Sequence, residues 1–78
     1  MATASYVLPL SMLQAGESAH VVEVMGGESH VQRMRELGMT SGAELNVIQS
    51  GSPCIIRLAS QTLCFRSGDL LSVLVQPR

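Results

Sequence analysis

The chain has 78 residues, of which 46% are hydrophobic and 14% are charged. This length allows one small domain, and the apolar content is sufficient for a core. The net charge is −1, with five Arg and no Lys, so the chain lacks the positive surplus with which nucleic-acid binders neutralise phosphates. No run approaches the roughly 18–20 apolar residues of a membrane span, and the first residues do not have the pattern of a secretory signal. We therefore expect no nucleic-acid binding, no membrane insertion and a cytoplasmic location.

Residues 1–7 are expected to form a flexible N-terminus, and residues 8–76 a single domain. Pro9 interrupts the first apolar run, at 7–13. Because proline cannot donate to a strand ladder, this run suits an edge or covering segment better than a central strand.

One helix is predicted between Gly26 and Gly42. Ser29 and Gln32 have the spacing of a capping box, in which each side chain satisfies a backbone N–H of the first turn. Gly38 is placed to supply the left-handed residue that closes such a helix. A narrow apolar stripe at helical spacing is formed by Val31, Met34 and Leu37. So short a helix is marginal alone in water and must pack on something else.

Short β-rich runs separated by turn signals make up most of the remaining chain, at 18–25, 43–49, 54–58, 62–66 and 71–76. This pattern favours an all-β fold over a βαβ fold. We expect a small five-stranded barrel with one short helix inserted after the first strand.

Three glycines, Gly16, Gly42 and Gly68, recur at equal spacing, each at the end of a small-residue turn. We interpret the period as repeated turn chemistry and not as a gene repeat. Alternate residues after each glycine are expected to face inward, namely Ala19, Val21, Leu45, Val47, Leu71, Val73 and Val75. The opposite face then carries Val22, Ile48 and Leu74, which the helix and the N-terminal segment are expected to cover. The alternative is that they stay uncovered and form a candidate partner surface.

The sequence does not predict an enzyme. No nucleophile, base and acid occur in a pattern that indicates activation, and no phosphate-binding glycine loop is present. Metal ligands do not fall at zinc-motif spacing either. We expect that no cofactor is required and that a divalent metal would bind only adventitiously, with His20 and His30 as the weak candidates.

Cys54 and Cys64 are expected on the two arms of a hairpin. If Leu58 pairs with Thr62, the two sulfur atoms are diagonal neighbours, at about 7–8 Å between Cα atoms, which is beyond comfortable disulfide reach. We therefore expect free, half-buried thiols.

Exposed charges beside the apolar stripe form the candidate contact set for a protein partner. Arginine is enriched at protein interfaces, and Arg33 is also placed to pair with Glu36 along the helix. The predicted partner-binding residues are Arg33, Arg35, Glu36, Met39, Arg57 and Arg66.

Several of these residues lie in a segment that resembles the FeoA family. The most specific part is Arg33-Met34-Arg35-Glu36-Leu37-Gly38-Met39, followed by Gly42. The runs Leu10-Ser11-Met12-Leu13, Pro53 to Leu58 and Thr62 to Arg66 are similar to the family as well. The resemblance extends from about Leu8 to Val75 and implies an SH3-like barrel with a helix after the first strand.

The resemblance also implies a role as a small cytosolic accessory of bacterial ferrous iron uptake. It further implies that the chain acts through the membrane transporter FeoB, on its cytosolic GTP-binding part. Related domains occur in metal-dependent repressors, so the alternative is a ferrous or transition-metal carrier or sensor. Recognition of proline-rich peptides is not expected, because such grooves are built from aromatic residues and this chain has only Tyr6 and Phe65. A homodimer through an edge strand stays open.

Overall fold

The computed structural model describes residues 6–78, so the predicted flexible segment 1–7 lies mostly outside the described residues. The strands are β1 (Leu8–Pro9), β2 (Ser18–Val24), β3 (Glu44–Gln49), β4 (Cys54–Leu58), β5 (Gln61–Phe65) and β6 (Val73–Pro77). The helices are η1 (Leu10–Met12), α1 (Glu28–Glu36) and η2 (Ser67–Leu70), of which η1 and η2 are short 3-10 helices.

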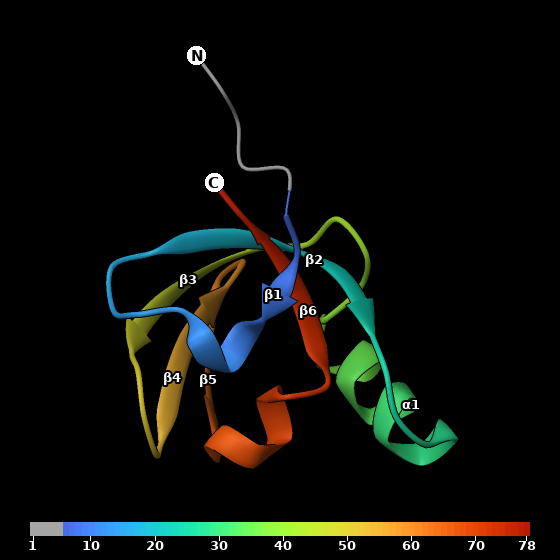
Figure 1. Ribbon diagram of the computed structural model, residues 1–78. Coiled ribbons are helices and arrows are strands. Elements are labelled where there is room, and N and C mark those ends of the chain that lie inside the picture. Colours follow the sequence, from blue (N-terminus) through green and yellow to red (C-terminus); the bar gives the residue numbers. More distant parts are fainter. Residues whose placement is uncertain (1–5) are drawn as a thin grey trace.

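All six strands belong to one antiparallel sheet in the order β1-β6-β2-β3-β4-β5, which curves around the core (Figure 1). The predicted all-β fold with one helix after the first long strand is confirmed. The sheet has six strands instead of five and is not closed, because β1 and β5 do not pair with each other. The additional strand is the edge segment at Pro9, which pairs with Leu74 of β6.

The sequence predicted the C-terminal end of α1 correctly and the N-terminal end wrongly. The capping box is wrong: Gly27 is the N-cap, no side chain caps the helix, and Ser29 lies inside the first turn. The C-terminus is as predicted, since Gly38 has a φ of +101°. Its N–H donates to the Arg35 carbonyl at 3.0 Å, and the N–H of Met39 donates to the Met34 carbonyl at 2.9 Å. This pair of hydrogen bonds is a Schellman motif.

Two of the three evenly spaced glycines make the same local structure. Gly16 and Gly42 have φ values of +93° and +90°. The N–H of Gly16 donates to the Val47 carbonyl, and the N–H of Gly42 donates to the Val21 carbonyl, at 2.8 and 2.7 Å. Each glycine thus begins a bulge that starts a strand. The interpretation as turn chemistry holds for this pair, whereas Gly68 lies in η2.

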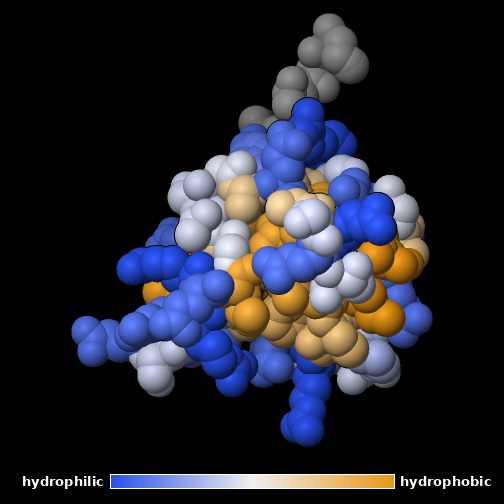
Figure 2. All heavy atoms as spheres, turned by 180° about the vertical axis from the view of Figure 1, so that it is seen from behind, coloured by the Kyte–Doolittle hydropathy of each residue, from blue (hydrophilic) through white to orange (hydrophobic). Residues whose placement is uncertain are grey.

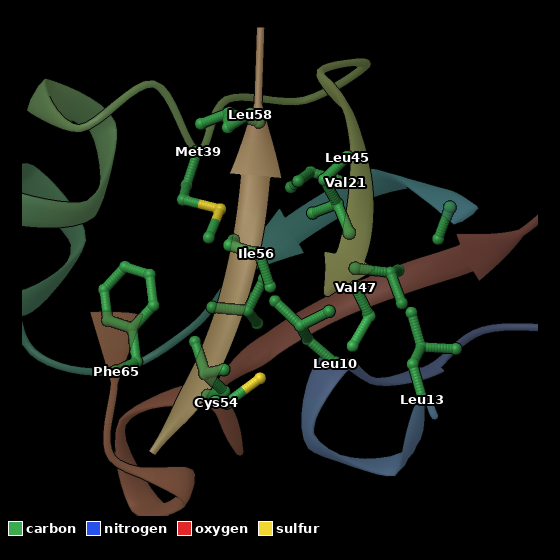
Figure 3. Packing of buried hydrophobic residues seen from close by; sticks show 14 of the residues in the cluster. Leu10, Leu13, Val21, Met39, Leu45, Val47, Cys54, Ile56, Leu58 and Phe65 are labelled. Atoms are coloured by element: carbon green, nitrogen blue, oxygen red, sulfur yellow. The ribbon is translucent and has the colours of Figure 1, made fainter. Parts of the chain in front are cut away.

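The core lies inside the curved sheet (Figure 3). Six of the seven predicted inward residues are buried, namely Ala19, Val21, Leu45, Val47, Val73 and Val75. The prediction is wrong for Leu71, which is 61% exposed. The reason is that η2 precedes β6, so Leu70 is buried and the alternation begins only at Val73.

The predicted outward apolar residues are covered unequally. Val22 and Leu74 are half-buried, and Leu74 lies beside Pro9 of β1. Ile48 is 49% exposed, so neither α1 nor the N-terminal segment covers it.

The β4–β5 hairpin turns one residue earlier than predicted. Leu58 pairs with Gln61 and not with Thr62, because Ala59 adopts a φ of +56° and allows a two-residue turn. A shift of one residue moves a side chain to the other face of a sheet. Cys64 is therefore exposed and Cys54 is buried among the core side chains (Figure 3), and both thiols are free.

Candidate partner-binding surface

Helix α1 is seated on the sheet through its apolar stripe. Met34 is fully buried, and the half-buried Leu37 packs against the core. At the C-terminal end, the side-chain amide of Gln61 donates to the Leu37 carbonyl at 3.0 Å. The helix is thereby tied to the turn of the β4–β5 hairpin.

A second tie holds the N-terminal end of α1. The Nε2 atom of His30 lies 2.7 Å from the hydroxyl of Ser72, which directly precedes β6. The carbonyl of Ser72 accepts the N–H of Met25 at 2.8 Å. The loop after β2 and the first turn of α1 are therefore both bonded to Ser72, and these bonds fix the position of α1 on the sheet.

Two shallow grooves run along this helix. The first, here called the strand groove, lies between β2 and α1 and has a volume of about 380 Å³. Its lining is mostly apolar with a charged or polar margin: Val22, Val24, Val31 and Met39, with Glu23, Arg35, Thr40 and Ser41. The second, the helix groove, has a volume of about 590 Å³ and is lined by Gly26, Glu28, Val31, Gln32, Arg35 and Glu36.

Val31 and Arg35 line both grooves and form the ridge between them. Val31 is half-buried, whereas Arg35 is exposed. Among residues 6–78, the one ion pair joins Arg78 to Glu44, so Arg35 has no carboxylate partner. Because arginine is enriched at protein interfaces, the unpaired guanidinium of Arg35 is the candidate anchor of this ridge, and Val31 adds apolar contact area beside it.

The view from behind shows the setting of α1, which lies at the left of Figure 2. Long hydrophilic side chains project there, and apolar surface borders them toward the middle of the face (Figure 2). A partner that docks beside α1 would therefore meet charged and apolar groups together.

The structure divides the predicted contact residues into separate groups. Arg33, Arg35 and Glu36 are exposed on α1. The predicted pair between Arg33 and Glu36 is wrong: Glu36 instead accepts a hydrogen bond of 3.5 Å from Gln32. Arg33 is therefore unpaired as well within the described part of the chain.

The other two predicted arginines lie outside the grooves. Arg57 projects from β4, between Asn46 and Thr62 of the neighbouring strands, and Arg66 precedes η2. Both are exposed, but neither lines a groove with Arg35.

Met39 requires a correction. Its side chain is 2% exposed and belongs to the core, where it follows the left-handed Gly38 and closes the helix (Figure 3). It forms the floor of the strand groove, so it supports the surface without offering contact area of its own.

The two histidines do not lie in a ligand cluster. His20 is on β2 opposite Glu44 and Gln76, and His30 is bonded to Ser72. Within residues 6–78, no group of three or more His, Cys, Asp or Glu side chains is placed to hold a metal ion.

The two thiols differ in environment. Burial raises the pKa of the Cys54 thiol, and the nearby Cys64 thiolate adds a smaller effect in the same direction. Thiol nucleophiles and soft metal ligands need the thiolate form, so Cys54 is in an inert environment.

Sequence reasoning missed two residues of this surface. Ser72 gave no signal, because its role comes from contact with a helix 42 positions earlier in the chain. Val24 was placed in a strand without being assigned to a face, and simple alternation could not have placed it, because the register of β2 against β6 shifts between Val21 and Glu23.

Comparison with known proteins identifies the family. The family model of the FeoA domain matches residues 8–77. The chain belongs to the FeoA family. Members of this family are associated with ferrous iron transport. A search of curated proteins gave no match.

Solved FeoA structures have the same fold. A crystal structure of an iron uptake regulatory protein (FeoA) is 29% identical, with a TM-score of 0.87 over 94% of this chain and 100% of that chain. The FeoA protein of Chlorobium tepidum is 27% identical, with a TM-score of 0.82 over 90% of this chain and 70% of that chain.

More distant structures extend the comparison of the fold. FeoA of Stenotrophomonas maltophilia, described as a procaryotic SH3 domain protein and complexed with zinc, is 23% identical, with a TM-score of 0.78 over 88% of this chain and 89% of that chain. A manganese-dependent transcriptional repressor is 13% identical, with a TM-score of 0.84 over 92% of this chain and 41% of that chain. The SH3-like prediction is confirmed, and the same fold occurs in metal-dependent repressors. Within residues 6–78, no helix of this FeoA chain is long and apolar enough to cross a membrane.

Proposed function

We propose that this FeoA protein binds the cytosolic GTP-binding part of the membrane iron transporter FeoB and modulates ferrous iron uptake. The family supplies the transport context, and it is not a known enzyme family. The observation that favours a protein contact is the ridge of Val31 and Arg35 between two grooves.

The chemistry of the ridge specifies what the partner must offer. An apolar side chain would fill the strand groove over Val22 and Val24, and a carboxylate would pair with Arg35. Since Arg35 has no ion pair in residues 6–78, no existing partner must be released first. A charge-assisted, bidentate pair with a carboxylate is among the stronger hydrogen-bonding arrangements in proteins.

Titration of the purified cytosolic domain of the cognate transporter tests the proposal by calorimetry. Arg35→Glu is expected to weaken binding at least about tenfold, because a buried charge pair becomes a repulsion. Arg57→Glu is the matched control, since it makes the same charge change on β4, outside the grooves, and should bind like the wild type. Unchanged binding by Arg35→Glu would remove the ridge from the interface, and no binding by the wild type would reject the partner.

The alternative proposal is a metal carrier or sensor, for which the zinc complex of the S. maltophilia relative is the favouring observation. That relative is 23% identical and shares the fold only, and within residues 6–78 no group of three or more His, Cys, Asp or Glu side chains is placed to hold a metal ion. Anaerobic calorimetry with ferrous ion tests it. Tight binding that is lost in His20→Ala or His30→Ala would favour this alternative, and the absence of heat would reject it.

A further inference from the structure

Strand β5 is a free edge of the sheet. It pairs with β4 along its whole length, from Gln61 to Phe65, and with no other strand within residues 6–78. The register between β4 and β5 is continuous, whereas β2–β6 and β3–β4 both contain shifts. A regular edge of this kind presents a row of unpaired backbone groups to its surroundings.

The register identifies which backbone groups are unpaired. Leu58 and Gln61 flank a two-residue turn and form a hydrogen-bonded pair, and such pairs alternate along an antiparallel ladder. Leu63 and Phe65 therefore bond to β4. The N–H and C=O groups of Thr62 and Cys64 point away from β4, and no other hydrogen bond in residues 6–78 uses them.

This edge carries none of the usual protection. Single-chain proteins blunt exposed edges with charges, prolines, bulges or very short strands. The other edge of this sheet follows that rule, since β1 has two residues and one of them is Pro9. By contrast, β5 is Gln-Thr-Leu-Cys-Phe, with no charge, no proline and no bulge.

We propose that β5 pairs antiparallel with β5 of a second copy of this chain, about a two-fold axis at Leu63. Thr62 then lies opposite Cys64 of the second copy, and both copies use all four of their free backbone groups. The two half-buried Leu63 side chains meet at the axis on the core side. A two-fold contact of this kind closes on itself, so it gives a dimer and not a fibre.

The charges next to β5 are compatible with this occupant. Arg57 lies beside Thr62 on the exposed face and would be in a row with Cys64 and Ile55 of the second copy. Arg66 follows β5 by one residue and would lie beside Ser60 of the second copy. No arginine is therefore placed against another arginine, and the neutral strand pairs with itself without repulsion.

The contact is small. One strand pair of five residues buries less than the roughly 1,200 Å² of a stable specific interface. The dimer is therefore weak and depends on protein concentration. Its surface is separate from the grooves, because no residue of β5 lines either groove. The inference does not rest on the proposed transporter contact.

Disulfide trapping tests the register. In the Thr62→Cys variant, the new thiol lies directly opposite Cys64 of the second copy, at about 5.5 Å between Cα atoms, within disulfide range. The two native Cys64 residues are diagonal neighbours at about 7–8 Å and should not crosslink. We expect a covalent dimer of Thr62→Cys under mild oxidation and its loss in Thr62→Cys/Cys64→Ser. Arg57→Cys, which adds an exposed thiol on β4, is the matched control and should form no covalent dimer.

Sedimentation of the untagged wild type over a wide concentration range tests the dimer itself. We expect a rising mass, and its loss in Thr62→Lys, which puts a charge on the edge. Thr62→Pro removes one free backbone donor without breaking a bond to β4, so it should also abolish the rise in mass. Circular dichroism checks that both variants fold. A wild type that stays monomeric, or a Thr62→Cys variant that crosslinks no faster than Arg57→Cys, would overturn the proposal. A monomeric wild type whose binding to the transporter domain is lost in Thr62→Lys would assign the edge to the transporter instead.

Discussion

The ridge beside α1 and the free edge of β5 both offer unpaired groups within residues 6–78, and they differ in chemistry. The ridge presents side chains, an apolar Val31 and a cationic Arg35, above grooves made by two elements. The edge presents backbone groups of one neutral strand. Side chains can select a particular partner, whereas backbone groups accept any strand of suitable shape.

Because of this difference, a substitution can change one of the two contacts of this small domain without changing the other. Charge substitutions on α1 should change the ridge and leave the edge intact, because Arg35 and β5 share no groove. The two surfaces also depend differently on the fold: the ridge requires α1 in its place, while the backbone pairing of β5 is with β4.

The largest effect is expected from Met34→Ala, which removes the seat of α1. Met34 is fully buried, and truncation of such a core methionine destabilises a protein by about 2–5 kcal/mol. In a domain of this size that is a large share of the total free energy of unfolding. Urea unfolding measures the loss. Gln32→Ala, on the exposed side of the same helix, should unfold near the wild-type midpoint, and equal midpoints for the two variants would show that α1 does not depend on this seat.

A smaller effect is expected from Gly38→Ala, which strains the end of α1. A Cβ atom at Gly38 would lie 2.9 Å from a methyl carbon of Leu58, and the φ of +101° is unfavourable for alanine. The left-handed conformation alone costs about 1–2 kcal/mol. Gly42→Ala isolates that backbone cost, because its φ is +90° and no atom lies within 4 Å of the added carbon. Gly38→Ala should be the less stable of the two in urea, and the reverse order would contradict the close packing at Leu58.

Ser72→Ala should loosen the other end of α1. The variant removes the 2.7 Å hydrogen bond with His30, and a typical bond of this kind contributes about 1 kcal/mol. Hydrogen exchange of the first turn of α1 should speed up, while exchange in β4 stays unchanged. Ser41→Ala, an exposed hydroxyl at the strand groove, serves as the control. If exchange speeds up equally in β4, the tie supports the whole domain and not the ridge alone.

The features that the sequence predicted are those that depend on residues close together in the chain. The strands and α1 follow from short-range periodicity, and Gly38 closes the helix because a left-handed residue is needed there. The hairpin register was missed because Ala59 adopts a positive φ that alanine rarely takes, and that one residue decides which face Cys64 occupies. Register depends on such turns, and composition does not reveal them.

The candidate surface was predicted only in part. The helical arginines were correctly placed beside the apolar stripe, but a list of charges does not say which of them share a groove. The strand groove arises where β2 and α1 are held against β6 by Ser72, a contact across 42 positions. Met39 was predicted as a contact, whereas the left-handed turn at Gly38 directs it into the core.

The smallest effect concerns Cys54 and sharpens the contrast between the core and the β5 edge. Burial raises the pKa of Cys54 above its value in the unfolded chain, so the folded state holds the thiol proton more tightly. Below the ordinary thiol pKa of about 8.5 both states keep the proton, and the free energy of unfolding is unaffected. As the pH rises from there toward the pKa of the folded state, the unfolded chain loses its proton first, so the free energy of unfolding falls. Urea unfolding from pH 7 to 10 should therefore show a steeper loss of stability in the wild type than in Cys54→Ala. Cys64→Ala removes the exposed thiol of β5 and should keep most of the wild-type slope; a slope that instead disappears with Cys64 would assign the titration to the edge.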